Sequence, residues 1–187
     1  MRTIRLLLCL LTVSVCFSCK KSPEKKTQEA SGPTYFSVIQ FANDQFRTYW
    51  GQPFTLVKKV YKRGKVDSSL VAAKDVDWAK ELKPFFESDI SHPSYLDQYQ
   101  FSVLNDDVTV SRTYFYEAKN EKLFTRSIQI ITDPFTNKIK NIFIETEKNG
   151  AVRKLYYTPL RIIQIQEFDK TLLGREENVR TEFRFLY

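Results

Sequence analysis

The chain has 187 residues and a formal net charge of +7, with 27% charged and 14% aromatic residues. Its length suits one folded domain with a real hydrophobic core, and no nucleic-acid-binding motif accompanies the basic charge, so we expect no nucleic-acid partner. All three cysteines lie within the first 19 residues. A domain that follows this segment therefore has no disulfide and no cysteine-based metal site.

The first 19 residues have the order of a lipoprotein signal peptide. Arg2 and Arg5 form a basic start, and an apolar run follows over residues 6–15. Two lysines after Cys19 end this segment too early for a helix that spans a bilayer, which needs roughly 20 apolar residues. We therefore expect removal of residues 1–18 and lipidation of Cys19. An ordinary secretory signal with a coincidental cysteine is the alternative.

The segment Val15-Cys16-Phe17-Ser18-Cys19 resembles the lipobox of bacterial lipoproteins, and the lysines behind it and the Phe- and Tyr-rich body resemble lipoproteins of Bacteroidota. The resemblance implies diacylation of the Cys19 sulfur by chains such as palmitate, and hence stable attachment to a membrane. In that group an acidic run after the cysteine is associated with export to the cell surface. Lys20-Lys21-Ser22 stands here instead, which implies an outer-membrane protein that faces the periplasm.

Residues 19–34 are predicted to be the lipidated cysteine and a flexible tether. Residues 20–34 contain no large apolar side chain that could stabilise a fold. At roughly 5–6 Å times the square root of its length, such a tether holds a domain on the order of 20 Å from the membrane. We expect a single α+β domain over residues 35–187.

The first predicted element of this domain is a helix. Pro33 suits an early helical position, and Gly51 ends the segment. Apolar residues recur at three- and four-residue spacing between these positions, namely Tyr35, Ile39, Ala42, Phe46 and Tyr49. A face packed on a sheet explains this stripe better than a ligand-stacking surface.

A second helix is predicted after an ambiguous segment. Residues 54–66 fit a strand or a short helix, and we favour a strand that ends at a turn near Gly64. Asp75 or Asp77 can cap the second helix, and Pro84 should kink it by removing one backbone donor. Its apolar face is Trp78, Leu82, Phe85 and Phe86, and it ends near His92-Pro93.

From Tyr95 onward the pattern has a period of two, with turns every ten to twelve residues or so, which is typical of antiparallel hairpins. The predicted strands lie near 96–104, 108–117, 122–132, 138–147, 151–158, 160–168 and 179–186. Asn149-Gly150 is the strongest turn signal, because both central positions of a type I′ turn need positive φ. One strand face is apolar, with Ile128, Ile130, Ile142, Ile144, Ile163, Ile165, Phe183 and Phe185.

These elements predict an α+β fold in which two N-terminal helices pack on one face of a curled antiparallel β-meander of about six to seven strands. Such a fold is similar to the half-barrel of bacterial lipoprotein-carrier and lipoprotein-receptor proteins. The similarity is at the level of the fold, and a fold does not determine a function.

Few residues suggest chemistry. The single histidine, His92, follows Glu87 and Asp89, and the three are candidates for metal ligands or an acid–base group. A helix-terminal or turn role explains them better, so we expect no catalytic, cofactor or metal site. The densest basic cluster is Lys58, Lys59, Lys62, Arg63 and Lys65, which fits a solvated strand edge better than a lipid-headgroup site.

The sequence leaves three functions open. The first is a membrane-anchored lipoprotein with a non-catalytic binding or structural role in the envelope, with a protein partner. The second is a periplasmic carrier or receptor of lipid or another apolar ligand in a hollow between sheet and helices, which requires that hollow to be open rather than filled by Phe and Tyr. The third is an enzyme with an acidic site at His92.

Overall fold

The computed structural model describes residues 35–170 and 176–186. The predicted signal peptide over residues 1–18, the predicted lipidation site Cys19 and the predicted tether to residue 34 lie outside the described residues, as does the loop 171–175 that connects the last two strands.

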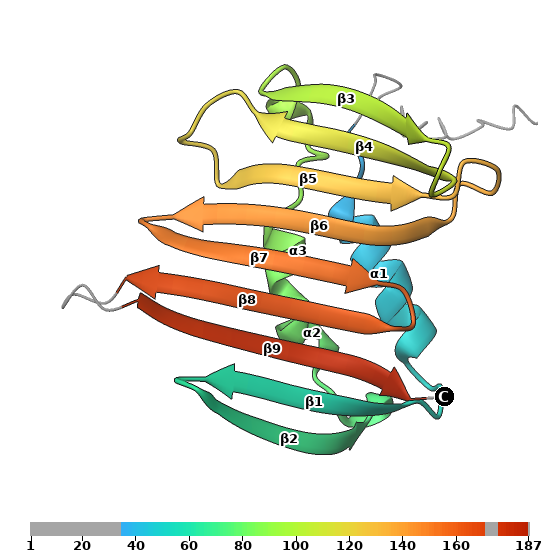
Figure 1. Ribbon diagram of the computed structural model, residues 1–187, viewed down its shortest axis with the longest axis vertical. Helices are drawn as coiled ribbons and strands as arrows, with labels where there is room; N and C mark the ends of the chain where they lie inside the picture. The colour runs from blue at the N-terminus through green and yellow to red at the C-terminus, as the bar shows by residue number, and fades with distance from the viewer. Residues whose placement is uncertain (1–34, 171–175, 187) are drawn as a thin grey trace, which may run out of the picture. The chain divides into compact units, whose positions relative to one another are not determined.

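The described strands form one antiparallel sheet with the order β2-β1-β9-β8-β7-β6-β5-β4-β3 (Figure 1). Within the described ranges β2 and β3 each have one neighbouring strand, so the sheet is curled but not closed. The strands are β1 (Thr55–Lys62), β2 (Lys65–Ala72), β3 (Tyr99–Asp106), β4 (Ser111–Ala118), β5 (Thr125–Thr132), β6 (Ile139–Lys148), β7 (Ala151–Thr158), β8 (Ile162–Lys170) and β9 (Glu176–Leu186).

The sheet has nine strands in the described part of the chain, rather than the six to seven that we expected. The seven strands predicted from residue 96 onward are β3 to β9, and they form a continuous meander. The favoured strand within 54–66 is β1, whereas β2 was not predicted. Because β2 lies at the sheet edge and most of it is exposed, its sequence carries no clear alternation. The domain is therefore β-dominant, with few helices.

The first helix, α1 (Val38–Tyr49), begins later than Pro33 suggested. Ser37 is its N-cap, and the Ser37 hydroxyl accepts a hydrogen bond from the Gln40 backbone N–H at 3.2 Å. The predicted apolar stripe is partly wrong, because Val38 is buried while Ile39 is 42% exposed. The helix packs through Val38, Ala42 and Tyr49.

The second predicted helix is two short helices, α2 (Trp78–Glu81) and α3 (Lys83–Glu87), which are separated at Leu82. Asp77 caps α2, as predicted, by accepting a hydrogen bond from the Lys80 backbone N–H at 3.2 Å. Pro84 lies in the first turn of α3, where its missing donor costs no helical hydrogen bond. Short 3-10 helices precede and follow this pair, η1 (Ala73–Asp75) and η2 (Pro93–Tyr95).

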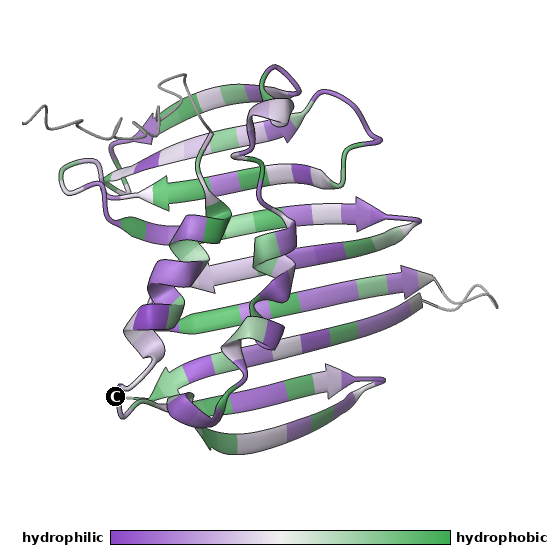
Figure 2. Cartoon of the chain, turned by 180° about the vertical axis from the view of Figure 1, so that it is seen from behind, coloured by the Kyte–Doolittle hydropathy of each residue, from purple (hydrophilic) through white to green (hydrophobic). Residues whose placement is uncertain are grey.

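The helices cover one face of the sheet, and Figures 1 and 2 show α1 and the α2–α3 segment lying across the strands on the same side. The predicted apolar face is confirmed, because all eight of its residues are buried. The connection that contains α2 and α3 carries the chain from the β2 edge to the β3 edge. The hydrophobic core therefore lies between this helical layer and the sheet.

The predicted hairpin turn at Asn149-Gly150 is confirmed. Its φ angles are 54° and 80°, so both residues adopt the left-handed conformation that a type I′ turn needs. Leu160 also has a positive φ, of 54°, in the turn after Pro159 that joins β7 to β8. The turn chemistry thus sets the register of the central hairpins.

Candidate functional site

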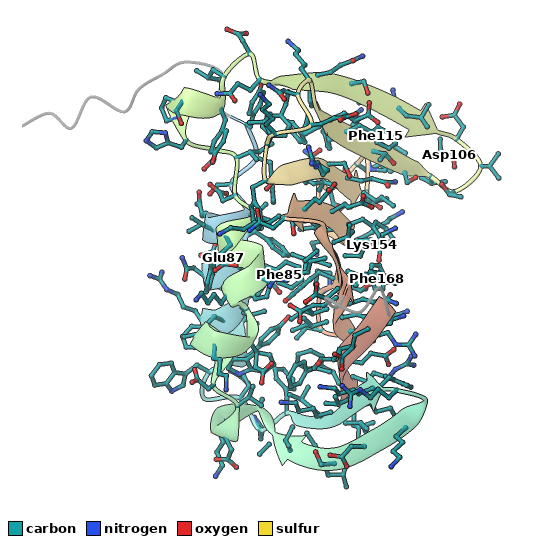
Figure 3. The ribbon with its side chains drawn as sticks, turned by 90° about the vertical axis from the view of Figure 1, so that its left-hand side faces the viewer. Phe85, Glu87, Asp106, Phe115, Lys154 and Phe168 are labelled. Carbon is teal, nitrogen blue, oxygen red and sulfur yellow. The ribbon has the colours of Figure 1, made fainter. Side chains whose placement is uncertain are left out.

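A row of ring and amide side chains crosses the face of the sheet opposite the helices. Each member of the row is the register partner of the next on five successive strands. Figure 3 shows Phe115, the first member, on the side of the sheet away from Phe85 and Glu87 of α3. We call these residues the outer row: Phe115, Gln129, Phe143, Tyr156 and Gln164.

The centre of the outer row is a pair of packed rings. The ring centroids of Phe143 and Tyr156 lie 4.7 Å apart, and Phe143 is 40% exposed. The Tyr156 hydroxyl donates a hydrogen bond to Asn141 Oδ1 at 3.2 Å, and the Thr158 hydroxyl donates to the same oxygen at 2.7 Å. These contacts hold Tyr156 in place, so the rings form an ordered apolar surface with polar groups at its border.

A shallow depression of about 230 Å³ lies beside Phe143 on this face. Polar side chains of three strands line it, among them Gln129, Glu145 and Lys154. Lys154 Nζ lies 3.3 Å from Glu145 Oε2 and 6.0 Å from the centroid of the Phe168 ring. Figure 3 places Lys154 and Phe168 on the same side of the sheet as Phe115. The depression thus combines an exposed ring with hydrogen-bonding groups.

The outer row continues into a buried carboxylate. Glu182 is the register partner of Gln164 and is only 2% exposed, although it lies on the face that the helices leave uncovered. Its two carboxylate oxygens lie 3.1 Å from Arg180 Nε and 3.2 Å from Arg184 Nε. The Arg180 guanidinium also lies 3.9 Å from the centroid of the Tyr61 ring. These side chains shield Glu182 from water and stabilise this part of the sheet.

A larger hollow of about 790 Å³ lies beside α3, where β6 and β8 end and β7 begins. Its central charged group is Arg153, whose Nη1 lies 3.2 Å from Glu87 Oε2 and whose Nε lies 2.8 Å from Glu167 Oε1. Because these groups neutralise one another, the hollow offers a ligand fewer free charges than its lining suggests.

The structure does not bring the predicted candidates Glu87, Asp89 and His92 onto a common partner. Glu87 pairs with Arg153, as described above. Asp89 accepts hydrogen bonds from the Ile39 backbone N–H at 3.1 Å and from the Ser91 hydroxyl at 2.5 Å. His92 is exposed, and its Nδ1 accepts a hydrogen bond from the Ser94 backbone N–H at 3.2 Å. Asp89 therefore ties the start of α1 to the end of α3, and His92 caps η2.

The predicted basic cluster is also divided by the fold. Lys58 faces the helices and pairs with Glu81 at 2.9 Å. Lys59 lies on the opposite face, as the register partner of Glu182. Lys62 and Arg63 each lie 3.2 Å from Glu177 Oε1, and these neighbours lower the pKa of the Glu177 carboxyl. Our interpretation of this cluster as a strand edge was wrong for Lys58, Lys59 and Lys62, because β1 has a neighbouring strand on both sides. It holds for Lys65, which is exposed at the start of the edge strand β2.

Aromatic side chains fill the centre of the space between helices and sheet, away from the hollow beside Glu87. Tyr49, Phe85 and Tyr157 are each at most 1% exposed, and the hydroxyl groups of Tyr49 and Tyr157 share a hydrogen bond. Phe85 packs edge-on against Tyr157, with ring centroids 5.7 Å apart. Burial raises the pKa of the Tyr157 hydroxyl well above its ordinary value. The inner side of the sheet is thus a packed core where these residues meet.

Among the described residues, no group of three or more His, Cys, Asp or Glu side chains is arranged so that it could hold a metal ion. None of the helices within those residues is long and apolar enough to cross a membrane.

Comparisons with protein-family models, with curated proteins and with solved structures gave no match for this chain. Its function therefore has to be argued from its own residues.

We did not predict the outer row, because we considered only the apolar, core-facing side of the strands. A signal was present. Phe115, Phe143 and Phe168 occupy strand positions that alternate with core residues, where a solvated face normally carries polar side chains. Large rings at such positions mark a surface that is only partly solvated.

Proposed function

We propose that this chain is a lipid-anchored protein of the bacterial outer membrane that faces the periplasm. In this proposal Cys19 carries the lipid, and the folded domain has a non-catalytic role as a binding module for another protein of the envelope. The outer row and the depression beside Phe143 form its binding face.

The observation that carries the binding role is the packed pair Phe143 and Tyr156 on the uncovered face of the sheet. Aromatic side chains are enriched in protein–protein interfaces, where they supply a large apolar area that is already ordered. Gln129 and Gln164 flank the pair in the row and can hydrogen-bond to a partner's backbone or side chains. An apolar centre with polar neighbours is the arrangement found in such interfaces.

The packed inner side favours this role over that of a carrier. A carrier of an apolar ligand needs an open apolar space between sheet and helices, and Phe85, Tyr157 and Phe183 occupy the centre of that space. The hollow beside α3 is open, but the ion pairs of Arg153 with Glu87 and Glu167 line it, which suits an apolar ligand poorly. The enzyme alternative draws no support from Glu87, Asp89 and His92, since each is engaged with a different partner.

Mass spectrometry of the mature protein tests the anchor. We expect an N-terminus at Cys19 that carries acyl chains. Cys19→Ser in the full chain should abolish this modification and the membrane attachment that depends on it. A mature N-terminus elsewhere, or an unmodified Cys19, would contradict the anchor.

Site-specific photocrosslinking in the native envelope tests the binding face. A photoreactive amino acid at Tyr156 should give a discrete protein adduct that Phe143→Ala diminishes. The matched control is the same amino acid at Asn43, which is exposed on α1. Equal adducts from both positions, or none from Tyr156, would rule out the outer row as the binding face.

A further inference from the structure

Two loops of the domain repeat one local sequence. Asp106-Asp107-Val108-Thr109 connects β3 to β4, and Asp133-Pro134-Phe135-Thr136 connects β5 to β6. Both have the order aspartate, any residue, apolar residue, threonine. We call Val108 and Phe135, the apolar residues of the two loops, the twin tips.

The two loops are built by the same hydrogen bonds. Asp106 Oδ1 accepts from the backbone N–H groups of Val108 at 2.9 Å and Thr109 at 3.2 Å. Asp133 Oδ1 accepts from Phe135 N–H at 3.0 Å and from the Thr136 backbone N–H at 2.9 Å. Each threonine hydroxyl also donates to the aspartate, at 2.7 Å in the first loop and 3.0 Å in the second. Each loop is thereby ordered around its own carboxylate.

This construction leaves the twin tips in solvent. Val108 is 92% exposed and Phe135 is 82% exposed, the highest values among the exposed large apolar residues of the described chain. A flexible loop can fold such a side chain back onto the protein. Here the hydrogen bonds between aspartate and threonine fix the backbone on both sides of the apolar residue. Its side chain therefore already points outward, and binding costs little further conformational entropy of the loop.

The twin tips lie at one corner of the sheet. Arg112 at the start of β4 is the register partner of Thr132 at the end of β5, so both loops leave the sheet from neighbouring strand ends (Figure 1). Lys140 Nζ donates a hydrogen bond to the Val110 carbonyl at 2.7 Å, which links the second loop's strand to the first loop. The loops form one surface. Figure 3 shows its Asp106 end extending beyond the face opposite the helices.

We propose that the twin tips insert into the surface of the membrane to which the protein is anchored, so that the domain docks on the bilayer at this corner. The proposal rests on the lipid anchor of the proposed function. Its occupant is the lipid bilayer, and the class of lipid is zwitterionic.

The size of the surface favours a bilayer over a protein. A stable protein interface buries about 800 Å² on each partner, far more than two side chains supply. Shallow insertion of two apolar groups needs no complementary surface, because lipid tails accept any apolar shape. It also leaves the unpaired backbone edge of β3 in water, as it must, since a strand edge cannot enter hydrocarbon without hydrogen-bond partners.

The start of the described chain leaves the twin tips within reach of a membrane that holds the anchor. Tyr35 packs on Tyr99 of β3 and Tyr116 of β4, with ring centroids 6.0 Å and 5.4 Å apart. The eight residues of β3 span about 26 Å, so the first tip is on the order of 25 Å from this point. Residues 20–34 can reach on the order of 50 Å at full extension. The tether length therefore permits contact between the twin tips and the membrane. The β2 edge, eight strand spacings or about 38 Å from β3, is the most distant strand of the sheet and supplies the control position.

Charge indicates which lipid to use. Asp106, Asp107 and Asp133 are balanced by Arg112, Lys138 and Lys140 in and beside the loops. An anionic surface therefore gains little over a neutral one, and insertion should be insensitive to salt. Vesicles of phosphatidylcholine are the appropriate probe.

A single fluorescent reporter tests the docking. The only cysteine expected in the mature chain is the lipidated Cys19, so Lys138→Cys supplies a unique free thiol beside the second tip. The lipidated full-length protein, purified and reconstituted in phosphatidylcholine vesicles, should show a blue-shifted environment-sensitive label that shallow nitroxide lipids quench. The same label at Leu70→Cys, 70% exposed on β2, should remain aqueous.

Substitution of the tip sets the size of the effect. Phe135→Ser should lower the ratio of docked to undocked label roughly tenfold to a hundredfold, the range for withdrawing one phenylalanine side chain from an apolar phase. Leu70→Ser, a matched change at the far edge, should leave the ratio unchanged. Because both residues are exposed, both variants should unfold at the midpoint of the parent protein, which a denaturant titration checks.

Each outcome decides the inference. A label at residue 138 that is as aqueous as the one at residue 70, on a protein proven to be lipidated, overturns the docking and leaves the anchor intact. An unlipidated protein whose label nevertheless enters added vesicles upholds the docking and removes the anchor. A label that is shielded in the native envelope but aqueous in vesicles also overturns it, because a protein then covers the corner.

Discussion

The two faces of the sheet use the same kind of side chain in opposite settings. On the helix-covered face, Phe85 and Tyr157 are at most 1% exposed and pack edge-on in the core. On the opposite face, Phe143 is 40% exposed, and among the described residues its ring packs against that of Tyr156. Aromatic content in this domain therefore serves two purposes. The covered rings stabilise the fold, whereas the uncovered pair is the feature from which we infer binding.

The largest difference between the two faces is expected in the stability lost when one aromatic ring on each face is replaced by alanine. Phe85→Ala should destabilise the domain by about 3–5 kcal/mol, because it removes a buried ring and leaves a cavity. Phe143→Ala should cost about 1 kcal/mol or less, since the ring is partly solvated and makes one ring contact. Denaturant unfolding followed by circular dichroism measures both values. Similar costs would mean that the outer ring is also structural.

A smaller effect is expected at Glu182, where the uncovered face buries a charge. Glu182→Ala should cost about 1–2 kcal/mol, since Arg184 loses the acceptor of its Nε hydrogen bond and Arg180 loses an ion-pair partner, while both arginines can turn to solvent. Glu182→Gln retains the oxygen acceptor and should lose less. Unfolding titrations at low and high salt check this prediction, which fails if the two variants are equally stable.

Tyr99 provides a pH-dependent comparison on the covered face. Burial raises its pKa from 10.0 to about 12, and its hydroxyl donates to the Thr125 carbonyl at 2.9 Å. At a pH between about 10 and 12, the hydroxyl is therefore neutral in the folded protein but ionised in the unfolded chain. Its contribution to stability is complete below pH 10 and is lost as pH rises toward 12.

Tyr99→Phe isolates that contribution. The variant should be less stable by about 1 kcal/mol at neutral pH, because one buried hydrogen bond is lost. Its stability should also fall less steeply than that of the parent between pH 10 and 12. Unfolding midpoints measured between pH 10 and 12 test this prediction. Midpoints that fall equally with pH in the parent and in the variant would refute it.

The smallest effect concerns the loop carboxylates. Hydrogen bonds from Thr109 lower the pKa of Asp106, and those from Thr136 lower the pKa of Asp133, below the ordinary value of 3.8. The ionised form is therefore favoured by the folded loops, whose hydrogen bonds persist as pH falls to 3.8 and weaken below it. Carboxyl titration by NMR should give midpoints below 3.8 that Thr109→Val and Thr136→Val raise.

Local patterns predicted most of the fold. The alternation of Ile142 and Ile144 with polar neighbours marks a strand that is buried on one face, and Asn149-Gly150 marks the turn that follows it. Such signals depend only on neighbours in the chain. They were sufficient for the seven strands of the meander and for its apolar face.

Features that depend on distant partners were not predictable in this way. β2 is a strand because β1 pairs with it, and its own residues lack an alternating pattern. Ile39 fits the helical spacing as well as Val38 does, but the rotation of α1 on the sheet leaves it exposed. The outer row exists only once the register of five strands has aligned its members. These three features depend on how the strands and the helix pack together, and short stretches of sequence contain little information about that packing.

The pairing of the first strand with the last has a consequence for biogenesis. Thr55 pairs with Leu186, and Lys62 pairs with Val179. β1 can therefore pair with β9, which joins it to the rest of the sheet, only when the C-terminal segment of the chain is present. Contacts of such high sequence separation form slowly, because a long loop must close first. A chain that emerges from the ribosome N-terminus first thus cannot complete its sheet before the residues of β9 have emerged. Truncation of those residues would leave the β1–β2 hairpin with no strand that connects it to the rest of the sheet.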